Sequence, residues 1–128
     1  MKIILTSLLG ILITSASLAA YGQTNPLTIV DLADGTKILA DGNGMTVYLF
    51  DMDVDSNSTC YDACEKAWPP VLAPEGLAVS DEVGITVRKD GTQQLTFNGK
   101  PIYYYVGDGA QGDINGDGLG GVWHIINQ

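Results

Sequence analysis

An internal repeat constrains the folds open to this chain more strongly than any other feature of its 128 residues. The stretch DGTKILADGNGMTVYLFDMD occupies residues 34–53, and DGTQQLTFNGKPIYYYVGD occupies residues 90–108. Each opens on Asp-Gly-Thr, passes through a glycine turn and enters an aromatic segment that ends on aspartate. With one residue deleted in the turn, Trp68 also aligns with Trp123. The chain is therefore predicted to contain two similar halves, which cover residues 34–72 and residues 90–127.

Each half is predicted to contain a β-hairpin. Asn98-Gly99 is the strongest hairpin signal, because a type I′ turn needs positive φ at both of its central residues. In the first half, residues 41–44 (Asp-Gly-Asn-Gly) form a longer turn of the same kind. The flanking segments are rich in the β-branched and aromatic residues that strands favour. Further strands are expected over residues 27–32, 85–87 and 121–127.

One short helix is predicted over about residues 58–68. Ser58 or Thr59 can cap its first turn, and Thr59-x-x-Asp62 approximates a capping box. Trp68 precedes a proline, which disfavours the helical conformation and ends the helix there. The predicted fold class is therefore mainly β: a small β-rich domain of two pseudo-repeated hairpin halves with one short helix.

Residues 1–22 are predicted to be a signal peptide, which would leave residues 23–128 as the secreted domain. Lys2 precedes a short apolar run, and small residues that suit cleavage follow near residues 19–22. The run is short for a membrane span of about 20 apolar residues. No cysteine follows the candidate cleavage site to accept a lipid. We therefore expect a secreted or periplasmic domain with no stable membrane anchor after cleavage.

The net charge of the chain limits the kinds of partner that it is expected to bind. Fifteen acidic residues stand against six basic ones, which gives a formal net charge of −9 at pH 7. Such a surface repels phosphate backbones and anionic lipid headgroups, so nucleic acid is not an expected partner. The expected partner is an extracytoplasmic ligand or protein whose identity the sequence does not give, with cations and basic proteins favoured.

The motifs, taken in order, resemble a known family. Residues 48–53 (YLFDMD) and 103–108 (YYYVGD) both fit the pattern Tyr-x-aromatic-x-x-Asp. Between them stands Cys60-x-x-x-Cys64-x-x-x-Trp68-Pro-Pro, and Gly-Gly-Val-Trp follows near the end. This order resembles the bacterial secreted repeat family of unknown function, also described as lipoproteins with a Yx(FWY)xxD motif. The chain lacks the lipidated cysteine that this description implies, so the resemblance implies a secreted repeat domain and no particular activity.

Cys60 and Cys64 leave three roles open. Positions i and i+4 of a helix share a face about 6 Å apart, which suits a disulfide, and an exported chain meets oxidising conditions. A disulfide that staples the helix is therefore the leading expectation. Two thiolates could instead bind copper(I) together with His124, and Met45 or Met52 could supply a thioether. A redox-active thiol pair is the third role, although nearby aspartates oppose a thiolate.

Two acidic loops space oxygen ligands as the first half of an EF-hand loop does. The loop at residues 51–55 has aspartate at its twelfth position but lacks the glycine at its sixth. The loop at residues 113–118 has that glycine but carries histidine at its twelfth position. Acidic glycine-rich loops also form turns without metal, so no cofactor is certain, and calcium is preferred to copper. The candidate oxygen ligands are Asp51, Asp53, Asp55, Asp62, Asp113, Asn115 and Asp117.

No residue pattern predicts catalysis. The chain has one histidine, no Gly-x-Ser-x-Gly and no cofactor fingerprint, so an enzyme is not expected. The aromatic and acidic motif residues form a candidate binding surface, or they stabilise the sheet by packing across strands. The sequence therefore predicts a small exported binding or structural module, with a copper-binding or thiol-redox protein as the alternative. The motif residues are Tyr48, Phe50, Asp53, Trp68, Tyr103, Tyr105, Asp108 and Trp123.

Overall fold

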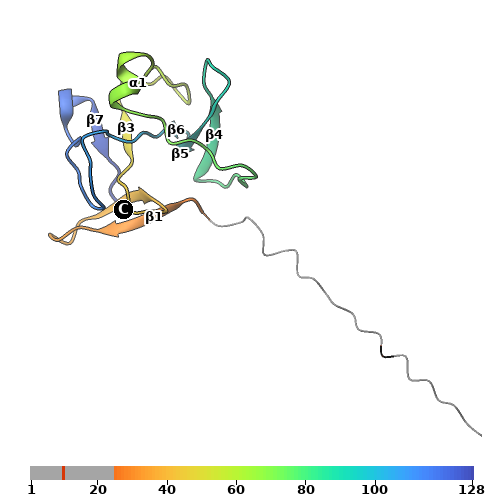
Figure 1. Cartoon of the computed structure of the whole chain (residues 1–128), viewed down its shortest axis with the longest axis horizontal. Coiled ribbons are helices and arrows are strands. Elements are labelled where there is room, and N and C mark those ends of the chain that lie inside the picture. The colour runs from red at the N-terminus through yellow and green to blue at the C-terminus, as the bar shows by residue number, and fades with distance from the viewer. Residues whose placement is uncertain (1–9, 11–24) are drawn as a thin grey trace, which may run out of the picture.

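A computed structural model of the chain describes residue 10 and residues 25–128 (Figure 1). The predicted signal peptide lies almost wholly outside the described residues. Within them, no helix is long and apolar enough to cross a membrane. The strands and helices are β1 (Leu27–Asp31), β2 (Lys37–Asp41), β3 (Tyr48–Phe50), α1 (Ala63–Ala67), β4 (Val83–Val87), β5 (Gln93–Phe97), β6 (Lys100–Pro101), the 3-10 helix η2 (Leu119–Gly121) and β7 (Trp123–Ile125).

The repeat predicted from the sequence is confirmed, and it also includes the strand before each Asp-Gly-Thr turn. β1 pairs with β2, and β4 pairs with β5, both antiparallel. The register is equivalent, since Leu27 faces Asp41 in one hairpin and Val83 faces Phe97 in the other. The predicted Asn98-Gly99 turn joins β5 to β6, with φ values of 49° and 79° at the two residues. The mainly β architecture of two similar halves with one short helix is therefore confirmed.

The two halves are interlocked, because each hairpin is completed by the C-terminal segment of the other half. The Leu39 N–H donates to the Ile126 carbonyl at 2.9 Å, and the Leu95 N–H donates to the Val71 carbonyl at 2.8 Å. The same exchange brings β3 of the first half beside β7 of the second half, as Figure 1 shows. Neither half therefore completes its hydrogen-bonding pattern with its own residues.

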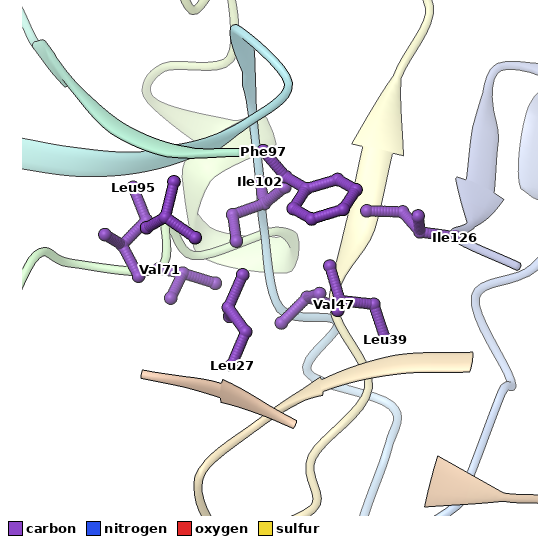
Figure 2. Close-up of a cluster of buried hydrophobic side chains, with 9 residues drawn as sticks. Leu27, Leu39, Val47, Val71, Leu95, Phe97, Ile102 and Ile126 are labelled. Carbon is purple, nitrogen blue, oxygen red and sulfur yellow. The ribbon is translucent and has the colours of Figure 1, made fainter. Parts of the chain in front are cut away.

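An apolar core lies between the two hairpins (Figure 2). Its side chains come from both halves and from the segments that cross between them, so its burial stabilises the interlocked arrangement as a whole. The buried members are Leu27, Leu39, Val47, Val71, Val83, Leu95, Phe97, Ile102 and Ile126.

The predicted helix is shorter than expected, and its predicted cap is wrong. Helix α1 begins at Ala63, and Asp62 stands before it with φ 54° and no side-chain capping bond. Thr59 is engaged elsewhere, because its N–H and its hydroxyl both donate to the Asp53 carboxylate, at 2.8 and 3.1 Å. The Asp53 carboxylate therefore binds the residue that was expected to cap the first turn.

Candidate functional site

The centre of the molecule is a close contact between the two aromatic motifs. Tyr48 and Tyr103 face each other in an antiparallel bridge, with N–H to carbonyl distances of 2.8 and 3.0 Å. Both residues are fully buried. The repeat places these two tyrosines at equivalent positions, so the bridge joins equivalent residues of the two halves.

Each motif tyrosine donates its hydroxyl proton to the motif aspartate of the other half. The Tyr48 hydroxyl donates to Asp108 Oδ2 at 2.6 Å, and the Tyr103 hydroxyl donates to Asp53 Oδ2 at 2.7 Å. Burial is the main cause that raises the pKa of both phenols above its ordinary value, and the aspartate that accepts each hydroxyl proton raises it further. Burial also raises the pKa of Asp53. The tyrosines are therefore neutral donors, and the pattern Tyr-x-aromatic-x-x-Asp joins one half to the other.

Four aromatic rings stack in a single column that we call the aromatic column. The Trp68 and Trp123 rings lie 3.8 Å apart, with planes 2° from parallel. Phe50 stacks on Trp123 at 4.0 Å, and Tyr105 stacks on Trp68 at 4.4 Å. Each outer ring therefore belongs to the half opposite the tryptophan that it covers.

The two bridging tyrosines pack edge-on against the aromatic column. The Tyr48 ring lies 5.3 Å from that of Trp68, and the Tyr103 ring lies 5.2 Å from that of Trp123, with planes nearly perpendicular. Stacked and edge-to-face pairs each add about 0.5–1.5 kcal/mol beyond the area they bury. Of the six rings, the two bridging tyrosines and the two tryptophans are buried. Phe50 and Tyr105, at the ends of the column, are half-buried.

The predicted disulfide between Cys60 and Cys64 is confirmed. The two Cα atoms lie 5.2 Å apart, and neither cysteine is free. Cys60 is fully buried and packs in the aromatic cluster, at the start of the segment that leads to α1. His124 pairs with Asp51 instead of the cysteines, with its Nε2 2.7 Å from Asp51 Oδ2. Because both cysteines are in the disulfide, they present no thiolates, and the copper or thiol-redox alternative is not favoured.

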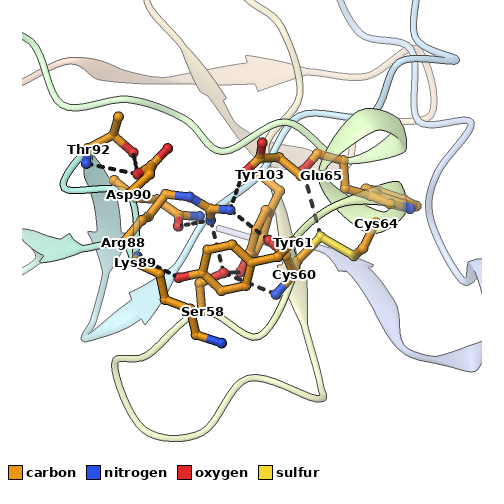
Figure 3. A network of polar contacts seen from close by, with 12 residues as sticks. Ser58, Cys60, Tyr61, Cys64, Glu65, Arg88, Lys89, Asp90, Thr92 and Tyr103 are labelled. Carbon is orange, nitrogen blue, oxygen red and sulfur yellow. Dashed lines mark hydrogen bonds and ion pairs between the residues drawn. A yellow bond between two sulfur atoms is a disulfide. The ribbon is translucent and has the colours of Figure 1, made fainter.

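A buried arginine that the sequence reasoning missed lies beside the disulfide (Figure 3). The Arg88 guanidinium donates to Gln94 Oε1 at 2.8 Å, to the Cys60 carbonyl at 2.7 Å and to Ser58 Oγ at 3.0 Å. It also forms an ion pair with Glu65. Its Nε has no hydrogen-bond partner among the described residues. Arg88 thereby ties the second hairpin to the cysteine segment of the first half.

The sequence does contain a signal for Arg88. The repeat alignment that matches Asp34 with Asp90 also matches Leu32 with Arg88. A charged residue that aligns with a leucine has no equivalent polar partners in the other half. Such a mismatch indicates that Arg88 makes polar contacts that have no counterpart at Leu32.

The carboxylates of the acidic loops bind backbone groups of the protein itself. Asp113 Oδ2 accepts the N–H groups of Gly109 and Ala110, each at 2.9 Å. Asp117 Oδ1 accepts the Ile125 N–H at 3.1 Å. Among residue 10 and residues 25–128, no group of three or more His, Cys, Asp or Glu side chains could bind a metal ion together. Calcium binding stays a prediction without an assembled ligand set.

The remaining candidate calcium ligands either contact other protein groups or are exposed. Asn115 donates to the Gly107 carbonyl at 3.2 Å, and Asp51 pairs with His124. Asp55 and Asp62 are exposed, each at a backbone position with positive φ.

Two grooves occupy equivalent places, each between the Asp-Gly-Thr turn of one half and the C-terminal segment of the other. The groove of about 380 Å³, here called the His124 groove, is lined by Leu32, Asp34, Thr36, Ile114, Asp117, His124, Ile125 and Asn127. The groove of about 310 Å³, here called the proline groove, is lined by Glu65, Pro69, Pro70, Leu72, Asp90 and Thr92.

The grooves share a backbone frame but differ in chemistry. Asp34 and Asp90 accept the N–H groups of Thr36 and Thr92, both at 2.9 Å, so the two turns are matched. Hydrogen bonds from these threonines lower the pKa of both aspartates, which keeps the carboxylates charged. The His124 groove adds Asp117 and a histidine to this frame, whereas the proline groove adds two prolines, a leucine and Glu65, whose charge is paired with Arg88.

Comparison with known proteins identifies the repeat. A family model described as a secreted repeat of unknown function matches residues 28–72 and again residues 84–127. The two matched segments are the two interlocked halves. No curated protein and no solved structure gives a match.

Proposed function

Because the chain belongs to the family of secreted repeats of unknown function, we propose that it is an exported, non-catalytic binding module whose ligand seat is the His124 groove. The ligand in this proposal is a positively charged segment of an extracytoplasmic protein. The interlocked halves serve as a rigid support for that seat.

The observation that carries the proposal is the acidic lining of the His124 groove. Asp34 and Asp117 line it, and Asp51 lies against its histidine. No lysine or arginine is present in the lining. All fifteen acidic residues of the chain lie within residues 25–128, against five of the six basic ones, so the surrounding surface also attracts cations.

The interlocked fold supports binding by a groove of this kind. The groove walls come from both halves, and the aromatic column and the exchanged backbone hydrogen bonds hold the halves together. A preformed site loses less conformational entropy on binding than a flexible loop does. The proposal therefore assigns the aromatic motif to the support and the divergent groove residues to recognition.

Titration of the purified protein with an octalysine peptide, followed by NMR of the backbone amides, tests this function. At low ionic strength we expect shifts centred on His124 and Asn127 that weaken as salt is added. Asp34→Asn and Asp117→Asn should each weaken binding about two- to fivefold, since exposed charge pairs contribute up to about 1 kcal/mol.

The repeat supplies a matched control. Asp90→Asn changes the equivalent carboxylate in the proline groove and should leave octalysine binding unchanged. Equal shifts around Asp90 and Thr92, or no shifts at low salt, would refute the assignment of the His124 groove as the seat.

A further inference from the structure

We propose that the aromatic column accepts an oxidising equivalent from a one-electron oxidant at the protein surface and passes it to Tyr48 or Tyr103, where it is held as a phenoxyl radical. The observation behind this activity is the direct contact between a stack of four rings and two hydrogen-bonded Tyr–Asp pairs. It is independent of the groove chemistry described above.

The column provides a continuous path for an electron. The two indoles lie 3.8 Å apart and nearly parallel, so that a radical cation can be shared between them. Phe50 and Tyr105 extend the stack at 4.0 and 4.4 Å. Every neighbouring pair of rings is therefore in van der Waals contact.

The path is open to solvent at Tyr105, which is half-buried while the tryptophans are buried. Two glycines permit this packing. A Cβ atom on Gly107 would lie 2.3 Å from the Tyr105 ring, and one on Gly116 would lie 2.6 Å from the Trp68 ring. An oxidant at the surface thus reaches the column through its outer ring without entering the core.

The Tyr–Asp pairs supply the proton acceptors that oxidation of a phenol needs. After the oxidant has taken one electron from the stack, Tyr48 gives an electron to the Trp68 radical cation. Its hydroxyl proton passes to Asp108 Oδ2 along the 2.6 Å hydrogen bond. The products are a neutral indole, a neutral phenoxyl radical and a protonated carboxyl group. Tyr103, Trp123 and Asp53 form the equivalent set at 2.7 Å.

The resting state keeps the proton on the phenol. Burial raises the pKa of Tyr48 and Tyr103, so neither hydroxyl ionises before it is oxidised. The return of one electron reverses the step, because the carboxyl group hands its proton back. The buried tyrosine therefore stores the oxidising equivalent, and only its O–H bond is broken.

A third hydrogen-bonded pair offers a control outside the column. The Tyr104 hydroxyl donates to Asp41 Oδ2 at 2.7 Å, but its ring packs against the apolar core. Tyr104 has the same kind of proton acceptor as the two bridging tyrosines. It differs from them in packing against the apolar core, whereas Tyr48 and Tyr103 pack against the tryptophans of the aromatic column.

Laser flash-quench oxidation of the purified protein by a dissolved ruthenium(III) polypyridyl complex tests the proposal by transient absorption. In the unaltered chain we expect a tryptophan radical that decays as a phenoxyl radical appears. The double variant Tyr48→Phe/Tyr103→Phe should lose the phenoxyl signal that grows in as the tryptophan radical decays, and its tryptophan radical should live longer; any phenoxyl radical formed directly at the half-buried Tyr105 would not follow that decay. Tyr104→Phe should behave as the unaltered chain does. Persistence of the full phenoxyl signal in the double variant would overturn the proposal.

A second measurement needs no substitution in the core. Because the proton acceptor is internal, the rate of phenoxyl formation in the unaltered chain should not change with buffer concentration. It should fall in D₂O, since a proton moves in the same step. A rate that rises in proportion to buffer base would show that solvent takes the proton and would also overturn the proposal.

Discussion

Trp68 and Trp123 lie face to face with ring centroids 3.8 Å apart, although each belongs to a different half of the chain. The contact joins the two halves at the middle of the molecule, and Phe50 and Tyr105 cover its outer faces. The interlocked fold is thus stabilised by contact between two tryptophans that are far apart in the sequence and occupy equivalent positions of the repeat.

Loss of one indole should destabilise the whole domain. Trp123 is 5% exposed, so Trp123→Ala should lower the free energy of unfolding by about 3–5 kcal/mol through lost burial and a residual cavity. Urea unfolding followed by circular dichroism measures this change. Val106→Ala is the control, because Val106 is 60% exposed and its truncation should cost less than about 0.5 kcal/mol. Similar losses in both variants would contradict the central role of the tryptophan pair.

The close approach at Gly116 should make even a methyl group costly. Its Cβ would lie 2.6 Å from the Trp68 ring and 3.0 Å from the Tyr48 ring, so Gly116→Ala should cost about 1–3 kcal/mol by overpacking. Gly109→Ala, in the same loop, meets nothing within 4 Å and should be close to neutral. Thermal unfolding of the two variants makes the comparison, and an unchanged melting temperature for Gly116→Ala would refute the packing described.

Replacement of Arg88 should leave several buried acceptors without a donor. Arg88→Met keeps the apolar stem but strands Gln94 and the Cys60 carbonyl, at a cost of about 3 kcal/mol. Lys89→Met, at the neighbouring exposed position, should cost less than about 0.5 kcal/mol. Denaturant unfolding measures both variants. An Arg88→Met variant as stable as the unaltered protein would show that the network contributes nothing net.

Reduction of the disulfide should weaken the fold modestly. The loop between Cys60 and Cys64 is short, so the chain-entropy contribution is about 2 kcal/mol. Denaturant unfolding with and without a phosphine reductant gives the difference. Alkylation of the untreated protein followed by intact-mass measurement checks that the disulfide is present in the purified protein. Two alkylated thiols in untreated protein would contradict the bond.

Two aspartates should give pH dependences of opposite sign. Hydrogen bonds from Thr92 lower the pKa of Asp90 in the folded protein, so its contribution to stability is present above pH 3.8 and is lost as pH falls through the lowered pKa. Burial raises the pKa of Asp53, so its contribution is full below pH 3.8 and is lost as pH rises through the raised pKa. Between pH 2 and 6, the melting temperature of Asp90→Asn should therefore fall relative to that of the unaltered protein as pH rises, whereas that of Asp53→Asn should rise relative to it. The same pH trend in both variants would contradict the assignment.

The sequence predicted the elements whose conformation depends on near neighbours. Asn98-Gly99 specified its turn because few other residue pairs accept positive φ at both positions. The spacing of Cys60 and Cys64 predicted their disulfide, but not its place: Cys60 lies before α1, so the bond joins the preceding segment to the helix instead of linking two positions within it. The cap at Thr59 was wrong because the helix begins only at Ala63, and the Asp53 carboxylate accepts both the N–H and the hydroxyl of Thr59.

Only the tertiary structure decided which half each motif joins. The pattern Tyr-x-aromatic-x-x-Asp is the same whether Tyr48 binds its own aspartate or that of the other motif, and the structure joins it to Asp108. Likewise, nothing near Arg88 in the sequence indicates the groups that surround its guanidinium. Local conformation depends on a few adjacent residues, whereas the choice of partner depends on which surfaces the complete chain buries. The sequence therefore determined the two halves, and the burial of the aromatic column determined that they interlock.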